Sequence, residues 1–150
     1  MCIRDRQYTG SFYPKVSKQG IELTFAVNHL AHFYLVNVLK DFIRDKEESR
    51  IIITSSDVHD PKSSGGNIGK KAGLNNLVDF RKKVTGQFLN FNADEAYKNS
   101  KLCNILFAKE LEKKLKMSTN KISVITWAPG LVIPNAVSYT HLTLPTIYSV

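Results

Sequence analysis

Apolar side chains recur on nearly every face of the segment from Gly20 to about Asp45. They are Ile21, Leu23, Phe25, Val27, Leu30, Phe33, Leu35, Val36, Leu39, Phe42 and Ile43. A helix with one solvent-facing side keeps its apolar residues in a single stripe, whereas here they surround the helix. The pattern therefore predicts a helix that is buried on most of its sides.

Two short runs of β-branched and apolar residues predict strands. Residues 51–56, Ile-Ile-Ile-Thr-Ser-Ser, begin after a charged residue and end in polar ones, which is typical of a buried parallel strand. We expect this strand to end near Ser55 or Ser56. Residues 121–127, Lys-Ile-Ser-Val-Ile-Thr-Trp, form the second strand, and Pro129-Gly130 stops it.

The segment between these strands begins as a long irregular connection and ends as a helix. Residues 57–93 are rich in glycine, with little periodicity apart from a short helix predicted over Leu74 to Lys83. Connections of this length in compact domains usually have a function. Asp94 is the predicted N-cap of the next helix, which runs to about Met117. Its apolar stripe is Leu102, Ile105, Leu106, Leu111 and Leu115.

The order helix, strand, loop, helix, strand predicts an α/β fold with a doubly wound parallel sheet. In such sheets ligands bind at the carboxyl ends of the strands. Ser55, Ser56 and the residues after Trp127 should therefore lie at the functional edge.

Composition limits the classes of partner. The chain has 150 residues, 43% of them hydrophobic, enough for one domain or part of one. The net charge of +8 is dispersed, with lysines and glutamates interleaved over residues 109–116 as on a solvated helix face, so we expect no nucleic-acid partner. No stretch approaches the roughly 20 apolar residues of a membrane span. Cys2 and Cys103 match neither a disulfide framework nor a zinc spacing.

Both ends of the chain differ in composition from the rest. Residues 136–150 carry no charged side chain, and together with residues 1–6 they resemble translated adapter sequence. We therefore expect residues 7–135 to be the native part, a partial catalytic domain between a non-native leader and a non-native tail.

Tyr97 and Lys101 are four residues apart, so on a helix they share one face. A free tyrosine, with a pKa of about 10, exchanges protons poorly at neutral pH, and a nearby cation lowers that pKa. The alternative is an ordinary helix with a surface lysine. His29 and His32 have no third ligand in view, so we interpret them as core or interface histidines and predict no metal site.

The order of these features along residues 20–135 resembles the short-chain dehydrogenase/reductase family. In chain order they are Asn28, the pair Ser55-Ser56, Tyr97 with Lys101, and Pro129-Gly130. Residues 28–33, Asn-His-Leu-Ala-His-Phe, are similar to the branch that contains retinol dehydrogenases and protochlorophyllide reductases, with Ala31 in place of the usual glycine. Residues 97–104, Tyr-Lys-Asn-Ser-Lys-Leu-Cys-Asn, resemble the protochlorophyllide reductase version of the active-site helix.

The resemblance implies a role for each catalytic residue. Tyr97 would supply or remove the proton, and Lys101 would hold the ribose hydroxyls of the cofactor and lower the Tyr97 pKa. Ser56 would hydrogen-bond the reacting oxygen, whereas Ser55 would only cap the strand. Asn28 would support a water-mediated proton path to Lys101, unless it only satisfies backbone hydrogen bonds.

The resemblance also implies a Rossmann-type fold and a nicotinamide cofactor, preferably NADPH. Tyr97 and Lys101 would contact this cofactor, and Pro129, Gly130 and Val132 would line its nicotinamide. The family's first strand and glycine-rich turn are missing from this sequence, so we expect the chain alone to be an inactive fragment.

Two enzyme classes remain open for the intact protein. One is a protochlorophyllide reductase-like enzyme acting on a porphyrin-like substrate, against which Leu131 counts, because many such enzymes have cysteine there. The other is retinol dehydrogenase-like chemistry on a retinoid or other hydrophobic carbonyl substrate, favoured by Ser55-Ser56 and Val58-His59. A non-catalytic binding or scaffold protein is the third alternative. The resemblance further implies a homodimer, with a plastid or cytoplasmic location if the first class holds.

Overall fold

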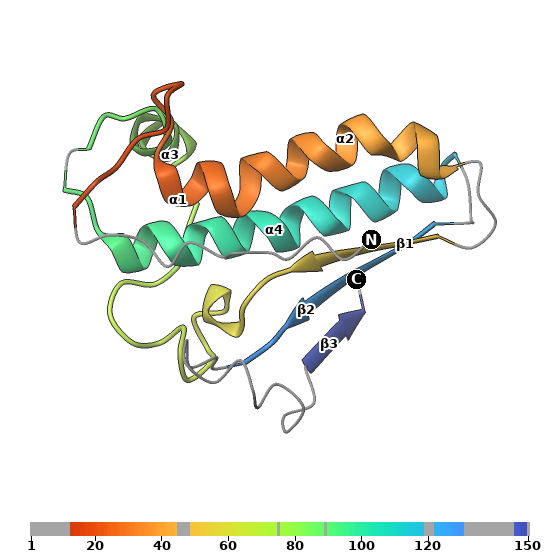
Figure 1. Ribbon diagram of the computed structural model, residues 1–150. Coiled ribbons are helices and arrows are strands. Elements are labelled where there is room, and N and C mark those ends of the chain that lie inside the picture. Colours follow the sequence, from red (N-terminus) through yellow and green to blue (C-terminus); the bar gives the residue numbers. More distant parts are fainter. Residues whose placement is uncertain are drawn as a thin grey trace, which may run out of the picture.

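A computed structural model describes residues 13–44, 49–74, 76–88, 90–118, 122–130 and 146–149. Its elements are α1 (Leu23–Phe25), the π-helical turn η1 (Ala26–Leu30), α2 (Ala31–Arg44), β1 (Ser49–Thr54), the 3-10 turn η2 (Asp57–His59), α3 (Leu77–Val84), α4 (Ala93–Lys116), β2 (Ile122–Ala128) and β3 (Thr146–Ser149). Figure 1 shows the two long helices, α2 and α4, on the same side of the sheet.

The sheet has the strand order β1-β2-β3. β1 and β2 are parallel, with Ser49 opposite Ile122 and Thr54 opposite Trp127. This pair confirms the predicted α/β class and corresponds to part of a doubly wound sheet. β3 pairs antiparallel with β2, and it falls in the tail that was left out of the predicted fold.

The core lies between the helices and one face of the sheet. Its buried members are Ile51, Ile53, Ala108, Leu111, Leu115, Ile122 and Val124. They alternate along the strands and recur at helical spacing along α4, so each element contributes one face. Ile52 points to the opposite face of the sheet, and 60% of its surface is exposed.

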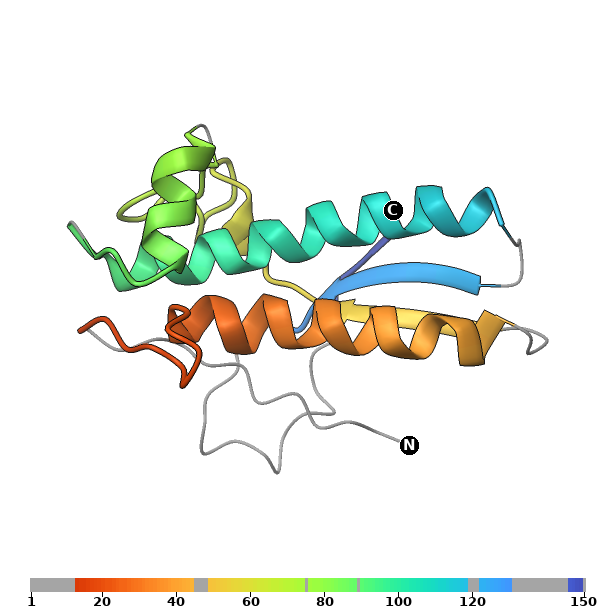
Figure 2. The ribbon, with the colours of Figure 1, turned by 90° about the horizontal axis from the view of Figure 1, so that it is seen from above.

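The first helical segment is less buried than its sequence predicts. Glu22 caps it, since its carboxylate accepts the amides of Thr24 and Phe25 at 2.9 and 2.7 Å. Beyond the π turn, however, large apolar side chains of α2 are exposed. The predicted burial on most sides is wrong for α2, because among the described residues only one side of this helix packs against α4 and the sheet, as Figure 2 shows from above.

The start of α4 also differs from the prediction. Asn92 is its N-cap, with an extended backbone and a side-chain oxygen that accepts the Glu95 amide at 2.8 Å. Asp94, the predicted cap, lies in the first turn, where its carboxylate instead forms an ion pair with Lys98 at 2.9 Å. Within the described ranges, no helix is long and apolar enough to cross a membrane.

Candidate functional site

The carboxyl ends of β1 and β2 form one edge of the sheet. Indole Nε1 of Trp127 donates to Oγ1 of Thr54 at 2.9 Å, and the Ser55 amide donates to the Trp127 carbonyl at 2.8 Å. Pro129 and Gly130 follow β2 at this edge. Gly130 has a φ of 77°, and no described atom lies within 4 Å of where a Cβ would be. Both residues therefore lie at the carboxyl end of β2, and their contact with a nicotinamide stays a prediction.

The two serines that follow β1 point in different directions. Ser55 is buried, and its hydroxyl donates to the main-chain carbonyl of Lys101 at 3.1 Å. It ties the strand end to α4. The Ser56 hydroxyl hydrogen-bonds the side chain of Tyr97 and approaches the Asp57 carboxylate at 3.3 Å. Ser56, rather than Ser55, is thus the serine that contacts Tyr97.

Tyr97 and Lys101 lie one turn apart on α4. The Lys101 ammonium is 5.5 Å from the centre of the Tyr97 ring, and the lysine side chain is buried. This distance is within the range of a cation–π contact. The alternative of a surface lysine is excluded, since only 1% of Lys101 is exposed.

The Tyr97 pKa is raised above its ordinary value of 10.0. Burial of the phenol is the main cause, the hydrogen bond from Ser56 lowers the pKa in part, and the charge of Asp57 raises it further. The predicted lowering of the Tyr97 pKa is therefore wrong for this structure, because burial is the largest influence on the phenol and it raises the pKa. At neutral pH Tyr97 is a phenol, which is a proton donor.

The π-helical turn η1 places Asn28 in the interior beside α4. Its side-chain amide donates to the Ser100 hydroxyl at 3.3 Å. Its carbonyl accepts from Nδ2 of Asn104 at 3.0 Å and from Nδ1 of His32 at 3.1 Å. Such turns are frequent at functional sites because they redirect backbone groups. Asn28 therefore joins the α4 face that carries the predicted site.

Asn104 joins this cluster of polar residues, although the sequence pattern predicts no role for it. Its amide nitrogen donates to two carbonyls, those of Asn28 and Thr54, each at 3.0 Å. Its oxygen faces Nδ1 of His29 at 2.9 Å. It lies seven residues, or about two turns, after Tyr97, so this spacing was the available signal.

The two histidines are half-buried beside Asn28 and Asn104. His29 contacts the rings of Phe25, Phe33 and Phe107, with centroid distances of 5.1 to 6.0 Å. Its pKa is lowered chiefly by burial, so its ring is neutral at pH 7. These contacts agree with the interpretation as core histidines. Val132, the remaining predicted cofactor residue, lies outside the described residues.

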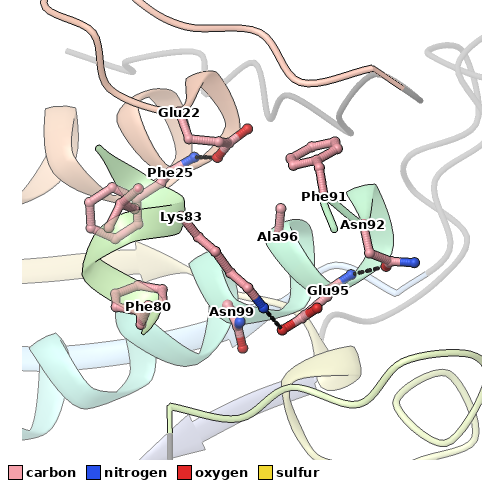
Figure 3. A pocket seen from close by; sticks show the side chains of 10 residues that line it. Glu22, Phe25, Phe80, Lys83, Phe91, Asn92, Glu95, Ala96 and Asn99 are labelled. Atoms are coloured by element: carbon pink, nitrogen blue, oxygen red, sulfur yellow. Dashed lines mark hydrogen bonds and ion pairs between the residues drawn. The ribbon is translucent and has the colours of Figure 1, made fainter. Parts of the chain in front are cut away.

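A pocket lies on another side of α4 and is not this site. It is lined by Glu22, Phe25, Phe80, Lys83, Val84, Phe91, Asn92, Glu95, Ala96 and Asn99. Figure 3 shows the Lys83 ammonium reaching the Glu95 carboxylate within it, at 2.6 Å. None of the four predicted catalytic residues lines this pocket.

Comparison with known proteins finds relatives that are named as oxidoreductases, dehydrogenases and reductases. The human WW domain-containing oxidoreductase is 39% identical over 100 residues, which are 67% of this chain and 22% of that protein. The mouse retinol dehydrogenase 14 is 31% identical over 85% of this chain and 33% of that protein. The protochlorophyllide reductase of Avena sativa is 28% identical over 87% of this chain and 45% of that protein. The chain thus spans less than half the length of each.

A solved structure has the same fold. It is an uncharacterized protein from Mycobacterium paratuberculosis, with a TM-score of 0.65 and 25% sequence identity over 87% of this chain and 42% of that chain. No protein-family model matches the sequence.

Proposed function

Because this chain belongs to the short-chain dehydrogenase/reductase family, we propose that the full-length protein containing it is an NADPH-dependent oxidoreductase in which Tyr97 donates the proton. The observation that carries the proposal is the contact of Tyr97 with Ser56 on one side and Lys101 on the other. A phenol, a hydroxyl and an ammonium from two elements meet at the sheet edge where ligands bind.

The residues present fit a nicotinamide cofactor. Among the described residues, no atom lies within 4 Å of where a Cβ on Gly130 would be, which leaves room for a flat ring at the strand ends. The ammonium of Lys101 is buried, and it can donate hydrogen bonds to the hydroxyl oxygens of a ribose. When bound, the cofactor supplies the hydride. The chain itself orients the ribose through Lys101 and holds the transferable proton at Tyr97.

The raised Tyr97 pKa suits a proton donor. The hydride's electron pair forms the new C–H bond, the π pair of the substrate moves to the neighbouring oxygen or carbon, and a phenol that stays protonated at neutral pH can give its proton to that atom. The lost proton is then replaced from solvent, and Asn28 with its bonded Ser100 offers polar groups along that route.

We propose a protochlorophyllide reductase-like substrate, a conjugated double bond in a hydrophobic, porphyrin-like molecule. Similarity of the α4 segment to that class supports it, as does the relative from Avena sativa. A retinol dehydrogenase-like reduction of a carbonyl is the second candidate. One observation favours it, because Ser56 and Tyr97 together can donate two hydrogen bonds to a carbonyl oxygen.

The test is turnover by the full-length product of the locus that encodes this chain. NADPH or NADH oxidation would be followed with protochlorophyllide and, separately, with retinal. Tyr97→Phe should lower kcat by about 10²–10⁴-fold, since it removes the general acid. Tyr13→Phe, a change at an exposed tyrosine, is the matched control. Undiminished turnover in Tyr97→Phe would sink the mechanism, and no turnover by the natural protein would favour the non-catalytic scaffold.

We also propose that the full-length protein is a homodimer formed through α2. The supporting observation is a set of exposed apolar side chains on this helix, namely Phe33, Tyr34, Val38, Leu39 and Phe42. Phe42→Glu should convert the dimer to a monomer in light-scattering measurements. An unchanged mass in that variant would reject this interface.

A further inference from the structure

The loop between η2 and α3 is fastened at its beginning to the turn that follows Ser56. The Ser63 hydroxyl donates to the Asp57 carbonyl at 2.8 Å and accepts the Gly66 amide at 2.9 Å. A Cβ on Gly66 would lie 1.9 Å from the Asp60 carbonyl oxygen, so only glycine allows this packing. Residues 60–66 are therefore packed directly on η2.

The same loop is fastened at its far end to α4. The Lys98 ammonium donates to the carbonyl of Ile68 and, at 3.0 Å, to the carbonyl of Lys70. The neighbouring residue Asn99 accepts the Gly73 amide at 2.8 Å. Figure 1 shows the loop, yellow to green, passing from the end of β1 to α3 beside the N-terminal half of α4.

The side chain of Lys98 is almost completely buried. Only 2% of its side chain is exposed, and its third partner is the Asp94 carboxylate at 2.9 Å. An ammonium has three N–H donors, and here each has an acceptor. Burial of a charged group is unfavourable unless the group is fully paired, so this arrangement requires the loop carbonyls to be present.

The carboxylate of Asp94 also shapes the loop. Gly69 has a φ of 64°, and a Cβ there would approach Oδ2 of Asp94 to 2.9 Å. The loop chain therefore runs close enough to the Asp94–Lys98 pair for both charged groups to contact it. Loop and helix form one hydrogen-bonded unit.

We propose that Lys98 is a positioning residue, which holds loop 60–73 between η2 and α4 and thereby fixes Ser56 against Tyr97. The chain of contacts runs from Lys98 through the loop to Ser63 and Asp57, the residue after Ser56. The effect on the reaction rests on the proposed function. The attachment of the loop to α4 does not rest on the proposed function, and it can be measured without an activity assay.

The experiment uses the full-length protein with Lys98→Met, Lys98→Arg and, as the matched control, Lys114→Met. Lys114 also pairs with an acidic residue four positions earlier on α4, but 71% of its side chain is exposed. Hydrogen exchange of the amides of residues 66–73, kcat, KM and NADPH affinity would be compared.

In Lys98→Met, we expect the amides of residues 66–73 to exchange at least tenfold faster, while NADPH affinity stays within twofold of the natural protein. The value of kcat/KM should fall about 10²-fold, as for a catalytic group displaced by about 1 Å. Lys98→Arg should regain part of both losses, and Lys114→Met should change neither. A merely structural role would lower NADPH affinity and thermal stability together instead.

Two outcomes overturn the proposal separately. Unchanged exchange of residues 66–73 in Lys98→Met shows that the lysine does not hold the loop, whether or not the protein is an enzyme. Faster exchange with unchanged kcat/KM shows that the loop does not position Ser56. If the natural protein has no turnover, the proposed function fails while the exchange result still decides the fastening.

A second variant covers the case in which Lys98→Met does not fold. Asn99→Ala removes only the side chain that accepts the Gly73 amide and leaves the buried charge paired. It should speed exchange at Gly73 and its neighbours and lower kcat/KM by a smaller factor. Unchanged exchange at Gly73 would overturn the fastening at this end of the loop.

Discussion

The two halves of α4 use the same helix for different purposes. Apart from Cys103, the first half buries polar side chains, which are Lys98, Asn99, Ser100, Lys101 and Asn104, whereas the second half buries Ala108, Leu111 and Leu115. An acidic residue and a lysine four positions apart occur in both halves, as Asp94–Lys98 and as Glu110–Lys114. The first pair is surrounded by loop carbonyls and the second by solvent.

The buried polar side chains of the first half set the geometry of the site, and the buried apolar side chains of the second half stabilise the fold. Buried polar groups fix geometry only when all their hydrogen bonds are made, and they contribute little net stability. Buried apolar groups stabilise by removal of their surface from water. Substitutions of the buried polar residues in the first half should therefore change the reaction more than stability, and those of the apolar residues in the second half should do the reverse.

The largest effect on stability is expected from Leu111→Ala in the second half. Leu111 is buried between α4 and the sheet, so its truncation removes apolar contacts and leaves a cavity. The free energy of unfolding should fall by about 2–5 kcal/mol, measured by urea denaturation of the full-length protein. Leu106→Ala, at an exposed position on the same half, is the control. Equal losses in the two variants would contradict the assigned core.

At high pH, the ionisation of Cys103 should lower the free energy of unfolding by a similar amount. Burial raises its thiol pKa from 9.0 to about 11, so the unfolded chain loses its proton first as the pH rises. Stability from this group is complete below pH 9 and is lost between pH 9 and 11, by about 3 kcal/mol for two pKa units.

Cys103→Ala isolates this contribution. The variant should be less sensitive to pH between 9 and 11 than the natural protein, when unfolding is followed by circular dichroism. Tyr97, whose pKa is also raised, adds a slope of the same sign that the variant retains. An identical slope in both proteins would exclude Cys103 as a source of the pH dependence.

A smaller loss of stability, but a clear loss of activity, is expected from Asn104→Ala. The change removes the donor shared by the Asn28 and Thr54 carbonyls, at a cost of about 1–3 kcal/mol for groups left unsatisfied. Because the Asn28 backbone loses this hydrogen bond, we expect kcat to fall by at least tenfold. Asn37→Ala, which removes an exposed side-chain bond to the Phe33 carbonyl, should leave kcat unchanged. A loss of stability without a loss of kcat would mean that Asn104 only packs.

The smallest effect is expected at the exposed ion pair of the second half. Lys114→Ala should change the free energy of unfolding by about 0.5 kcal/mol or less, because the pair is 3.8 Å long and solvated. A loss several times larger would contradict the view that the Glu110–Lys114 pair, unlike the Asp94–Lys98 pair, is solvated and contributes little to stability.

The sequence was sufficient to predict α4 and the two parallel strands, but not β3. The periodicity of the apolar residues predicted these elements because local patterns reflect the face that each element buries. The rule for strand ends in such sheets also predicted that Ser56 and the residues after Trp127 share one edge. The roles of Asn28, Tyr97 and Lys101 in a reaction stay predictions.

Features that depend on distant segments could not be predicted. Lys98 has the local pattern of any helical lysine, and its burial depends on carbonyls about thirty residues earlier in the chain. The Tyr97 pKa is raised chiefly by burial of the phenol, which depends on segments distant in the sequence. The cap of α4 at Asn92 rather than Asp94 was a choice between two suitable residues that only the backbone conformation decides.

The π-helical turn at Ala26–Leu30 has a consequence for how this protein can change in evolution. Such a turn accommodates one residue more than a regular helix does, and each helical residue rotates the chain by about 100°. Loss of one codon within the turn would restore a regular helix and would rotate Asn28 relative to the residues of α2. The segment can thus accept many replacements of its outer side chains, whereas a change in its length would disconnect Asn28 from Ser100 and Asn104 in a single step.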